Sequence, residues 1–237
     1  MKWETWEPYY EKIATKLDLD TESDRTATEV LHHLLINTNP RPLLNRLESL
    51  IEENDVVVCG GGPSLDRHLQ EIIRDPRMSQ SVFVAADGAT SAFLELEQMC
   101  DIIVTDLDGD RNDLVTMNRK GALTIVHGHG DNIPILKRVV PEMLPVLGST
   151  QVKPTSRVFL WGGFTDGDRA CFIASHYNPR KIILAGMDFG SIVGRWSKPN
   201  EDHHFKANTM KQAKLDIAKR LINELRQQDD TEYILFD

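Results

Sequence analysis

The stretch Asp55-Val-Val-Val-Cys59 runs directly into Gly60-Gly61-Gly62-Pro63-Ser64, and this junction decides the fold of the 237-residue chain. The β-branched run is typical of a buried strand, and the residues after it indicate a tight turn that opens a helix. Such a turn lets the backbone approach a ligand, and the amides at a helix N-terminus can donate hydrogen bonds to a phosphate group. It has neither the lysine of a P-loop nor a G-x-G-x-x-G pattern, so a plain strand-to-helix turn and a methyltransferase-like loop remain alternatives.

Downstream of this junction, short apolar runs alternate with helical patterns. This alternation predicts an α/β fold with a mainly parallel, Rossmann-like sheet and helices on both faces. The predicted strands are 55–59, 82–86, 102–105, 122–126, 157–160, 181–185 and 232–236. The predicted helices are 65–74, 89–97, 111–119, 132–140, 167–176 and 206–227. Residues 144–156 fit either a short strand or a loop.

Upstream of the junction the patterns are helical. Trp6, Tyr9, Tyr10, Ile13 and Leu17 recur at helical spacing, and residues 21–36 and 43–51 give two further helical segments. We therefore expect a helical N-terminal appendage over 1–52, followed by an α/β catalytic domain over 53–237.

Composition narrows the classes of partner. The formal net charge of -9 provides no global positive field for nucleic acid or an anionic membrane, so phosphate binding has to be local. No apolar stretch reaches the roughly 18 residues of a membrane span, and we expect a cytoplasmic protein. The cysteines Cys59, Cys100 and Cys171 lack paired spacings and are expected to be reduced thiols in the core. A homo-oligomer is compatible with the sequence.

Polar and glycine-rich clusters follow the predicted strands. Because the carboxyl ends of parallel strands meet at one edge of a sheet, these clusters are expected to converge on one pocket. They are 60–64, 87–88, 106–110, 127–132, 161–168 and 186–190.

The segment Asp101-Ile-Ile-Val-Thr-Asp106-Leu-Asp108-Gly-Asp110 places carboxylates at alternate positions after an apolar run. Hard oxygen ligands of this kind suit Mg²⁺, which typically uses one or two carboxylates, waters and substrate phosphates. Asp87 follows the preceding strand in the same way. We expect metal binding by Asp106, Asp108 and Asp110 beside Asp87. An acidic, solvated turn in which Asp110 caps the next helix is the alternative.

The turn from His127 through His129 to Asp131 and Asn132 follows the next strand. The two imidazoles are candidates for phosphate binding, and Asp131 and Asn132 are candidates for substrate binding. Two histidines two positions apart do not make a zinc site without further ligands. The alternative is a polar loop in which Asp131 caps a helix.

Two later segments add candidates. Trp161 offers a flat surface for an aromatic heterocycle, or belongs to the core. Asp188-Phe-Gly190 imitates a protein-kinase motif without its companion loops, so Asp188 is kept only as a pocket residue or turn cap. Lys198 and Lys206 flank a polar loop that could fold over the pocket and neutralise phosphate charge, or simply be solvated.

The chain resembles the archaeal 6-hydroxymethyl-7,8-dihydropterin pyrophosphokinase family from about Asp55 to its C-terminus. The ordered motifs that carry the resemblance are Cys59-Gly-Gly-Gly-Pro-Ser64, Ala86-Asp-Gly-Ala89, Thr105-Asp-Leu-Asp-Gly-Asp110, His127-Gly-His-Gly-Asp-Asn132 and Ala185-Gly-Met-Asp-Phe-Gly190. The set is more specific than any one motif. The Asp-Gly-Ala and Asp-Leu-Asp pieces are also similar to those of thiamine pyrophosphokinases.

The resemblance implies transfer of diphosphate from ATP to the hydroxymethyl group of a pterin, with release of AMP, in folate or methanopterin synthesis. It implies Mg²⁺ at Asp106 and Asp108, supported by Asp87 and Asp110. It also implies that Gly60, Gly61, Gly62 and Ser64 meet ATP or the substrate.

Three alternatives stay open at this point. Thiamine pyrophosphokinase shares the chemistry, although the segment 127–132 favours the pterin. A metal-dependent nucleotide-sugar glycosyltransferase also uses Asp-x-Asp to hold a diphosphate. A non-catalytic nucleotide sensor would bind ATP without turnover.

Overall fold

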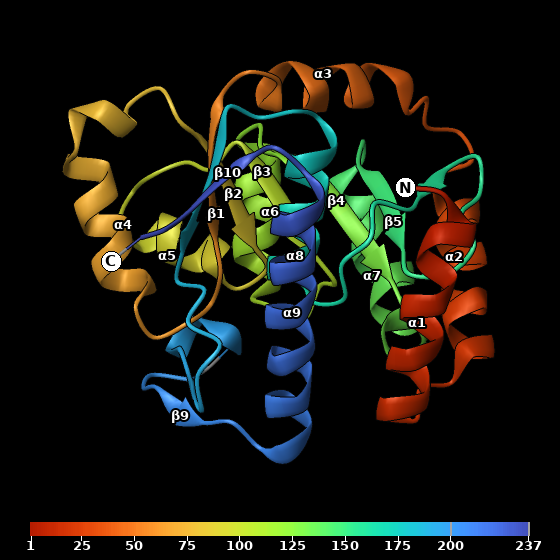
Figure 1. The fold of residues 1–237 in the computed structure, drawn as a ribbon. Helices are drawn as coiled ribbons and strands as arrows, with labels where there is room; N and C mark the ends of the chain where they lie inside the picture. Colours follow the sequence, from red (N-terminus) through yellow and green to blue (C-terminus); the bar gives the residue numbers. More distant parts are fainter. Residues whose placement is uncertain (200, 237) are drawn as a thin grey trace.

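A computed structural model describes residues 1–199 and 201–236. Among these residues, eight strands form one sheet in the order β10-β7-β1-β2-β3-β4-β5-β6, and every neighbouring pair is parallel (Figure 1). The strands are β1 (Asp55–Cys59), β2 (Val82–Ala86), β3 (Ile102–Thr105), β4 (Leu123–Gly128), β5 (Leu147–Thr150), β6 (Val158–Phe159), β7 (Lys181–Ala185) and β10 (Glu232–Leu235). The sequence therefore predicted the sheet and its parallel character correctly.

Helices cover both faces of this sheet, as predicted. The α-helices are α1 (Trp3–Leu17), α2 (Thr21–Leu34), α3 (Arg41–Ile51), α4 (Leu65–Arg74), α5 (Ala89–Glu95), α6 (Arg111–Arg119), α7 (Ile133–Met143), α8 (Asp166–His176) and α9 (Thr209–Gln228). Short 3₁₀ turns lie at Pro76–Met78, Gly130–Asn132 and Arg195–Ser197. No helix within the described residues is long and apolar enough to cross a membrane.

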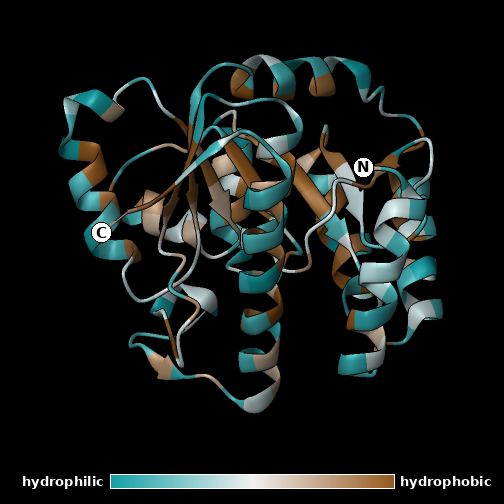
Figure 2. Ribbon diagram, viewed as in Figure 1, coloured by the Kyte–Doolittle hydropathy of each residue, from teal (hydrophilic) through white to brown (hydrophobic). Residues whose placement is uncertain are grey.

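Alternate strand residues divide the interior into two apolar cores. Val56 and Val58 face one core, which also contains residues of α1, α3, α8 and α9. Val57 and Cys59 face the other, which contains residues of α2, α4, α5, α6 and α7. Strands buried on both sides in this way read as continuous apolar runs, and the sheet is accordingly the most hydrophobic part of the ribbon (Figure 2). The N-terminal helices thus contribute to both cores.

The boundaries of two elements differ from the predictions, in one case because polar residues extend a strand and in the other because a polar side chain caps a helix. His127 and Gly128 extend β4 because they pair with Ser149 and Thr150 of β5, the strand that the sequence left ambiguous. The last helix begins at Thr209 instead of 206, since the side chain of Asn208 accepts a hydrogen bond from the amide of Lys211 and caps it.

A small antiparallel pair, β8 (Ile192–Val193) and β9 (Phe205–Lys206), was not predicted. Two-residue strands are too short to give a period-2 pattern. This pair projects beyond the carboxyl edge of the main sheet, as do α9 and the helices α1 and α2 (Figure 1).

The chain order sets the position of the pocket. Strands β1 to β6 are laid down successively in one direction, and the chain then returns to place β7 on the other side of β1. Strand order reverses at β1, and ligands of open α/β sheets bind at the carboxyl ends of strands near such a point. The cysteines Cys59, Cys100 and Cys171 are free and buried, as expected.

Candidate active site

A cavity of about 690 Å³ lies at the carboxyl edge of the sheet. It is lined by the loops that follow β1, β2, β3, β4 and β7, by the segment that opens α8, and by parts of the α1–α2 turn and α9. The predicted site residues that line it are Gly60, Gly61, Gly62, Asp87, Asp106, Asp108, His127, His129, Asp131, Asp188 and Lys198. The convergence expected from the sequence is therefore present.

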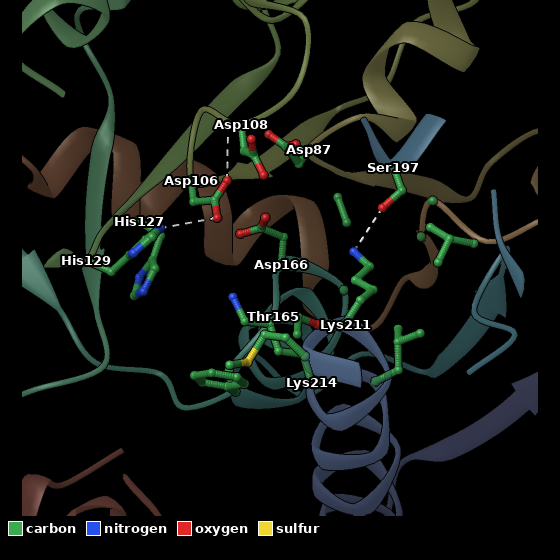
Figure 3. Close-up of a pocket in the computed structure, with 18 of the residues that line it drawn as sticks. Asp87, Asp106, Asp108, His127, His129, Thr165, Asp166, Ser197, Lys211 and Lys214 are labelled. Atoms are coloured by element: carbon green, nitrogen blue, oxygen red, sulfur yellow. Dashed lines mark hydrogen bonds and ion pairs between the residues drawn. The ribbon is translucent and has the colours of Figure 1, made fainter. Parts of the chain in front are cut away.

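A cluster of three carboxylates lies near the middle of the cavity (Figure 3). Oxygen atoms of Asp87, Asp106 and Asp166 all lie within 4.8 Å of one another. Asp87 follows β2, Asp106 follows β3, and Asp166 is the first residue of α8. Sequence reasoning missed Asp166, although it stands in the cluster 161–168 that was expected at this edge.

The backbone at this cluster is held in an unusual conformation. Asp87 has a φ of 44° and Leu107 a φ of 68°, in the left-handed region that residues with side chains rarely adopt. Local contacts maintain it: the amide of Asp87 donates to the carbonyl of Val104 at 2.8 Å, and the Thr105 hydroxyl donates to Asp87 Oδ1 at 2.5 Å. Strained backbone of this kind concentrates at functional sites.

Burial and mutual repulsion determine the charge state of the cluster. Burial and then the Asp106 charge raise the pKa of Asp87 to about 7. Burial and then the charges of Asp106 and Asp87 raise the pKa of Asp166 well above its ordinary value. Burial acts to raise the pKa of Asp106, but the interactions with His129, with the backbone amide of Asp108 and with Lys198 together outweigh it and leave that pKa lowered. The three groups thus resist being ionised together, which favours a bound cation.

Two positive or polar side chains support the cluster from neighbouring elements. His129 Nε2 lies 3.4 Å from Asp106 Oδ2. Arg169 is 1% exposed, and its Nη2 donates to the Phe164 carbonyl at 2.9 Å. Burial lowers the pKa of Arg169, and the nearby carboxylates, Asp166 first, counteract that effect. This guanidinium therefore balances part of the buried negative charge.

Residues 188–199 pack over the glycine-rich turn after β1. Ser64 does not line the cavity; its hydroxyl donates to Asp188 Oδ2 at 2.9 Å and ties the turn to the loop after β7. A Cβ atom on Gly62 would lie 2.1 Å from that same oxygen, and one on Gly88 would lie 1.7 Å from the Trp196 carbonyl. Glycine is required at both positions because other backbone or side-chain atoms pass this close.

The segment 188–199 is anchored by a separate ion-pair network. Arg195 contacts Asp66 at 3.1 Å and Glu95 at 2.7 Å, and its guanidinium lies 4.0 Å from the centre of the Trp196 ring. The Trp196 indole N–H donates to Asp66 Oδ1 at 2.7 Å. These contacts fasten the segment to α4 and α5 across the glycine-rich turns.

Lysine side chains reach the cavity from this segment and from α9. Lys198 contacts Asp108. Lys211 Nζ donates to Ser197 Oγ at 2.9 Å (Figure 3). Burial and then the Lys198 charge lower the pKa of Lys211. Lys214 also lines the cavity. Sequence reasoning missed Lys211 and Lys214 because both lie inside the predicted helix 206–227, where no motif distinguishes them from solvated lysines.

The structure brings other predicted residues to supporting positions instead of the cavity surface. The Asp110 carboxylate caps α6 through the amides of Asn112 and Asp113, so the third carboxylate of the cluster is Asp166 and not Asp110. Lys206 lies in β9 and does not line the cavity. Trp161 is 5% exposed and packs in the core.

Asn132 also has a structural position. It is 6% exposed, and its side-chain amide donates to the carbonyls of Asp106 and His127, each at 2.8 Å. Its side-chain oxygen accepts from the His129 amide at 3.0 Å. Asn132 therefore joins the ends of β3 and β4 and holds the histidine turn against the carboxylate cluster.

Comparison with known proteins gives full-length similarities. A family model described as 6-hydroxymethylpterin diphosphokinase MptE-like matches residues 31–194. The 6-hydroxymethyl-7,8-dihydropterin pyrophosphokinase of Pyrococcus furiosus is 41% identical over 236 residues, covering 100% of this chain and 99% of that protein. The protein of the same name from Methanocaldococcus jannaschii is 39% identical over 242 residues, covering 99% of this chain and 100% of the relative.

Proposed function

This chain belongs to the MptE-like family of 6-hydroxymethylpterin diphosphokinases, and we propose that it transfers diphosphate from ATP to the hydroxymethyl group of 6-hydroxymethyl-7,8-dihydropterin. The observation that carries the proposal is the position of the carboxylate cluster of Asp87, Asp106 and Asp166 in the cavity. Glycine turns and lysines lie on one side of the cluster, and the buried polar side chains of Asp24, His127 and Gln151 lie on the other.

The residues of the cluster fit Mg²⁺. They offer hard oxygen ligands within 4.8 Å of one another, and the raised pKa values of Asp87 and Asp166 mean that these two hold their charges poorly without a cation. We propose that Asp87, Asp106 and Asp166 hold the ion, with Asp108 beside them. When bound, Mg²⁺ would neutralise phosphate charge and align the transferred group.

In the proposed reaction the pterin hydroxyl oxygen attacks the β-phosphorus of ATP. The bond between that phosphorus and the oxygen bridging to the α-phosphate breaks, AMP leaves with the bridging oxygen, and the hydroxyl proton is released. Such transfers depend mainly on alignment and on neutralising charge. The chain's task is therefore to hold the two substrates in line across the cluster.

Nucleotide binding is assigned to the side of the cavity nearest β7, β1 and β2. The backbone of Gly60, Gly61 and Gly62, which lines the cavity, would approach the phosphate oxygens. Lys211 and Lys214 would neutralise the triphosphate from α9, with Lys198 contributing from the covering segment. These lysines supply the local positive charge that an acidic chain needs to bind ATP.

The test is to mix the purified chain with ATP, Mg²⁺ and 6-hydroxymethyl-7,8-dihydropterin, and to follow AMP and pterin diphosphate by chromatography. Equal amounts of both products are expected. Formation of ADP in place of AMP would indicate transfer of a single phosphoryl group. Turnover of thiamine but not of the pterin would be compatible with the proposed metal site but would refute the pterin as the acceptor.

A further inference from the structure

The order of the strands arranges the cavity as a linear series of groups. The glycine turns follow β1 and β2, Asp106 follows β3, His127 is the second-last residue of β4, and Gln151 follows β5 directly. Neighbouring strands lie about 4.8 Å apart. The two sides of the cavity are therefore separated by the carboxylate cluster, with the histidines on one side of it and Ser197 and Lys211 on the other (Figure 3).

The side away from the glycine turns is bounded by three buried polar residues, Asp24, His127 and Gln151, which we name the polar wall. Asp24 comes from α2, is 4% exposed, and lines the cavity. Its Oδ2 accepts hydrogen bonds from Gln151 Nε2 at 2.7 Å and from the Tyr10 hydroxyl at 2.6 Å. Its Oδ1 accepts from the Gly130 amide at 2.8 Å. An N-terminal helix thus supplies a carboxylate directly to the site.

The polar wall retains unused hydrogen-bonding capacity. An ionised carboxylate has about four lone-pair positions, and the contacts given above occupy three of those of Asp24. His127 is 3% exposed, and its Nδ1 pairs with Ser149 Oγ at 3.1 Å. The ring interacts with the Gln151 side chain, but its Nε2 has no partner at hydrogen-bond geometry among the described residues. Buried polar atoms are nearly always paired, so an unpaired one in a cavity wall indicates a ligand.

Apolar side chains flank the polar wall. Leu17 and Leu19 of the α1–α2 turn and Phe164 before α8 line the same cavity. A flat ring with polar atoms along one edge is suited to such surroundings, because its faces contact apolar groups and its edge contacts the wall. An aminopyrimidinone ring carries donors and an acceptor along one edge.

We propose that the polar wall is the recognition site for the aminopyrimidinone edge of the acceptor, with the Asp24 carboxylate accepting from its 2-amino group and His127 Nε2 meeting a ring or carbonyl atom. This inference rests on the proposed function, since it takes the acceptor to be a pterin. The acceptor would then lie between α1–α2 and the carboxylate cluster, with its hydroxymethyl group toward Asp106. Of the four residues expected from sequence at the substrate, Asp131 and Asp188 line the cavity, whereas Asn132 and Trp161 hold the surrounding structure.

The test uses the full chain and measures binding of 6-hydroxymethyl-7,8-dihydropterin by calorimetry without ATP, together with KM for both substrates. Asp24→Asn should weaken pterin binding about 10- to 100-fold, the effect of removing a hydrogen bond to a charged group. The KM for ATP should stay within about twofold, because the glycine turns and lysines are unchanged.

Tyr10→Phe is the matched control. It removes another hydrogen bond to the same carboxylate, but Tyr10 does not line the cavity. If Asp24 only supported the fold, both variants would weaken pterin binding equally, and the inference would be overturned. A loss specific to Asp24→Asn supports recognition.

An acceptor analogue separates recognition from folding more directly. The corresponding 6-hydroxymethyl lumazine has an oxygen in place of the 2-amino group, so the wild-type carboxylate should discriminate against it. Asp24→Asn should reduce that discrimination at least about tenfold, because the repulsion is removed. Unchanged discrimination would overturn the inference.

Leu19→Trp provides a variant outside the hydrogen-bonded network, should Asp24→Asn fold poorly. Added bulk beside the polar wall should weaken pterin binding and leave the KM for ATP unchanged; the reverse pattern would place the acceptor elsewhere. A wild-type chain that binds the pterin without releasing AMP would refute the proposed function alone. A wild-type chain that fails to bind the pterin would refute both.

Discussion

Asp87 and Asp166 approach the same point from two separate parts of the fold, one after β2 and the other at the start of α8, and their carboxylate oxygens lie within 4.8 Å of each other. Neither carboxylate forms an ion pair with a lysine or arginine among the described residues. Their proximity is costly without a cation, and the first two predictions follow from it.

Asp166→Asn should lower kcat at least about 100-fold, as loss of a group that stabilises developing charge does. Added Mg²⁺ should raise the Tm of the wild-type chain but not that of this variant, because the variant lacks one of the proposed ligands. Both are measured on the same preparation, by AMP release and by calorimetry.

Asp110→Ala is the matched control for Asp166→Asn. It removes a helix cap, which typically costs about 1 kcal/mol of stability, and it should retain the Mg²⁺-dependent rise in Tm. If Asp110→Ala lost the Mg²⁺-dependent rise in Tm and Asp166→Asn kept it, the third metal ligand would be Asp110 and not Asp166.

The metal-free chain should lose stability as pH rises toward neutrality because of Asp87. Its pKa is about 7 in the folded protein, against an ordinary value of 3.8. The folded state therefore binds the proton more tightly, and this stabilisation disappears as pH rises through 7. In urea unfolding with EDTA, the free energy of unfolding of the wild-type chain should fall relative to that of Asp87→Asn by about 2–3 kcal/mol as pH rises from about 5 to about 8.

Saturating Mg²⁺ provides the control for this pH effect. A bound cation favours the ionised carboxylate, so the difference between wild type and Asp87→Asn should no longer grow with pH. Equal pH dependence of the two proteins in EDTA would mean that Asp87 ionises normally in the folded state.

Lys211→Met should raise the KM for ATP about tenfold and leave pterin binding unchanged, because the lysine faces the nucleotide side of the cavity. Lys219→Met is the matched control: Lys219 is an exposed lysine of the same helix that does not line the cavity. Similar KM values for ATP in the two variants would show that Lys211 does not contribute to nucleotide binding.

Gly88→Ala should displace the segment that covers the glycine turns, because the added Cβ would lie 1.7 Å from the Trp196 carbonyl. We expect a higher KM for ATP and faster proteolysis between residues 190 and 208. At Gly190 an added Cβ would meet nothing within 4 Å, so Gly190→Ala should leave both unchanged. If the two variants had the same KM for ATP and the same rate of proteolysis, displacing the covering segment would have no effect on nucleotide binding.

Local sequence patterns were sufficient to predict the strands of the sheet and most of the residues that line the cavity. The apolar run 55–59 and its equivalents predicted strands, and the polar clusters after them converge as expected because parallel strands end at one edge. Weak local signals gave the errors: β8 and β9 are two residues each, and β5 carries Gly148 in a short run.

The sequence by itself determined the α/β architecture, the shared edge and the family motifs, since each depends on residues close together in the chain. Only the tertiary structure decided that Asp166 joins the carboxylate cluster in place of Asp110, that Lys211 faces the cavity, and that Asp24 of an N-terminal helix reaches it. Those relationships depend on strand order and on how helices pack across the sheet. No periodicity within one segment encodes them.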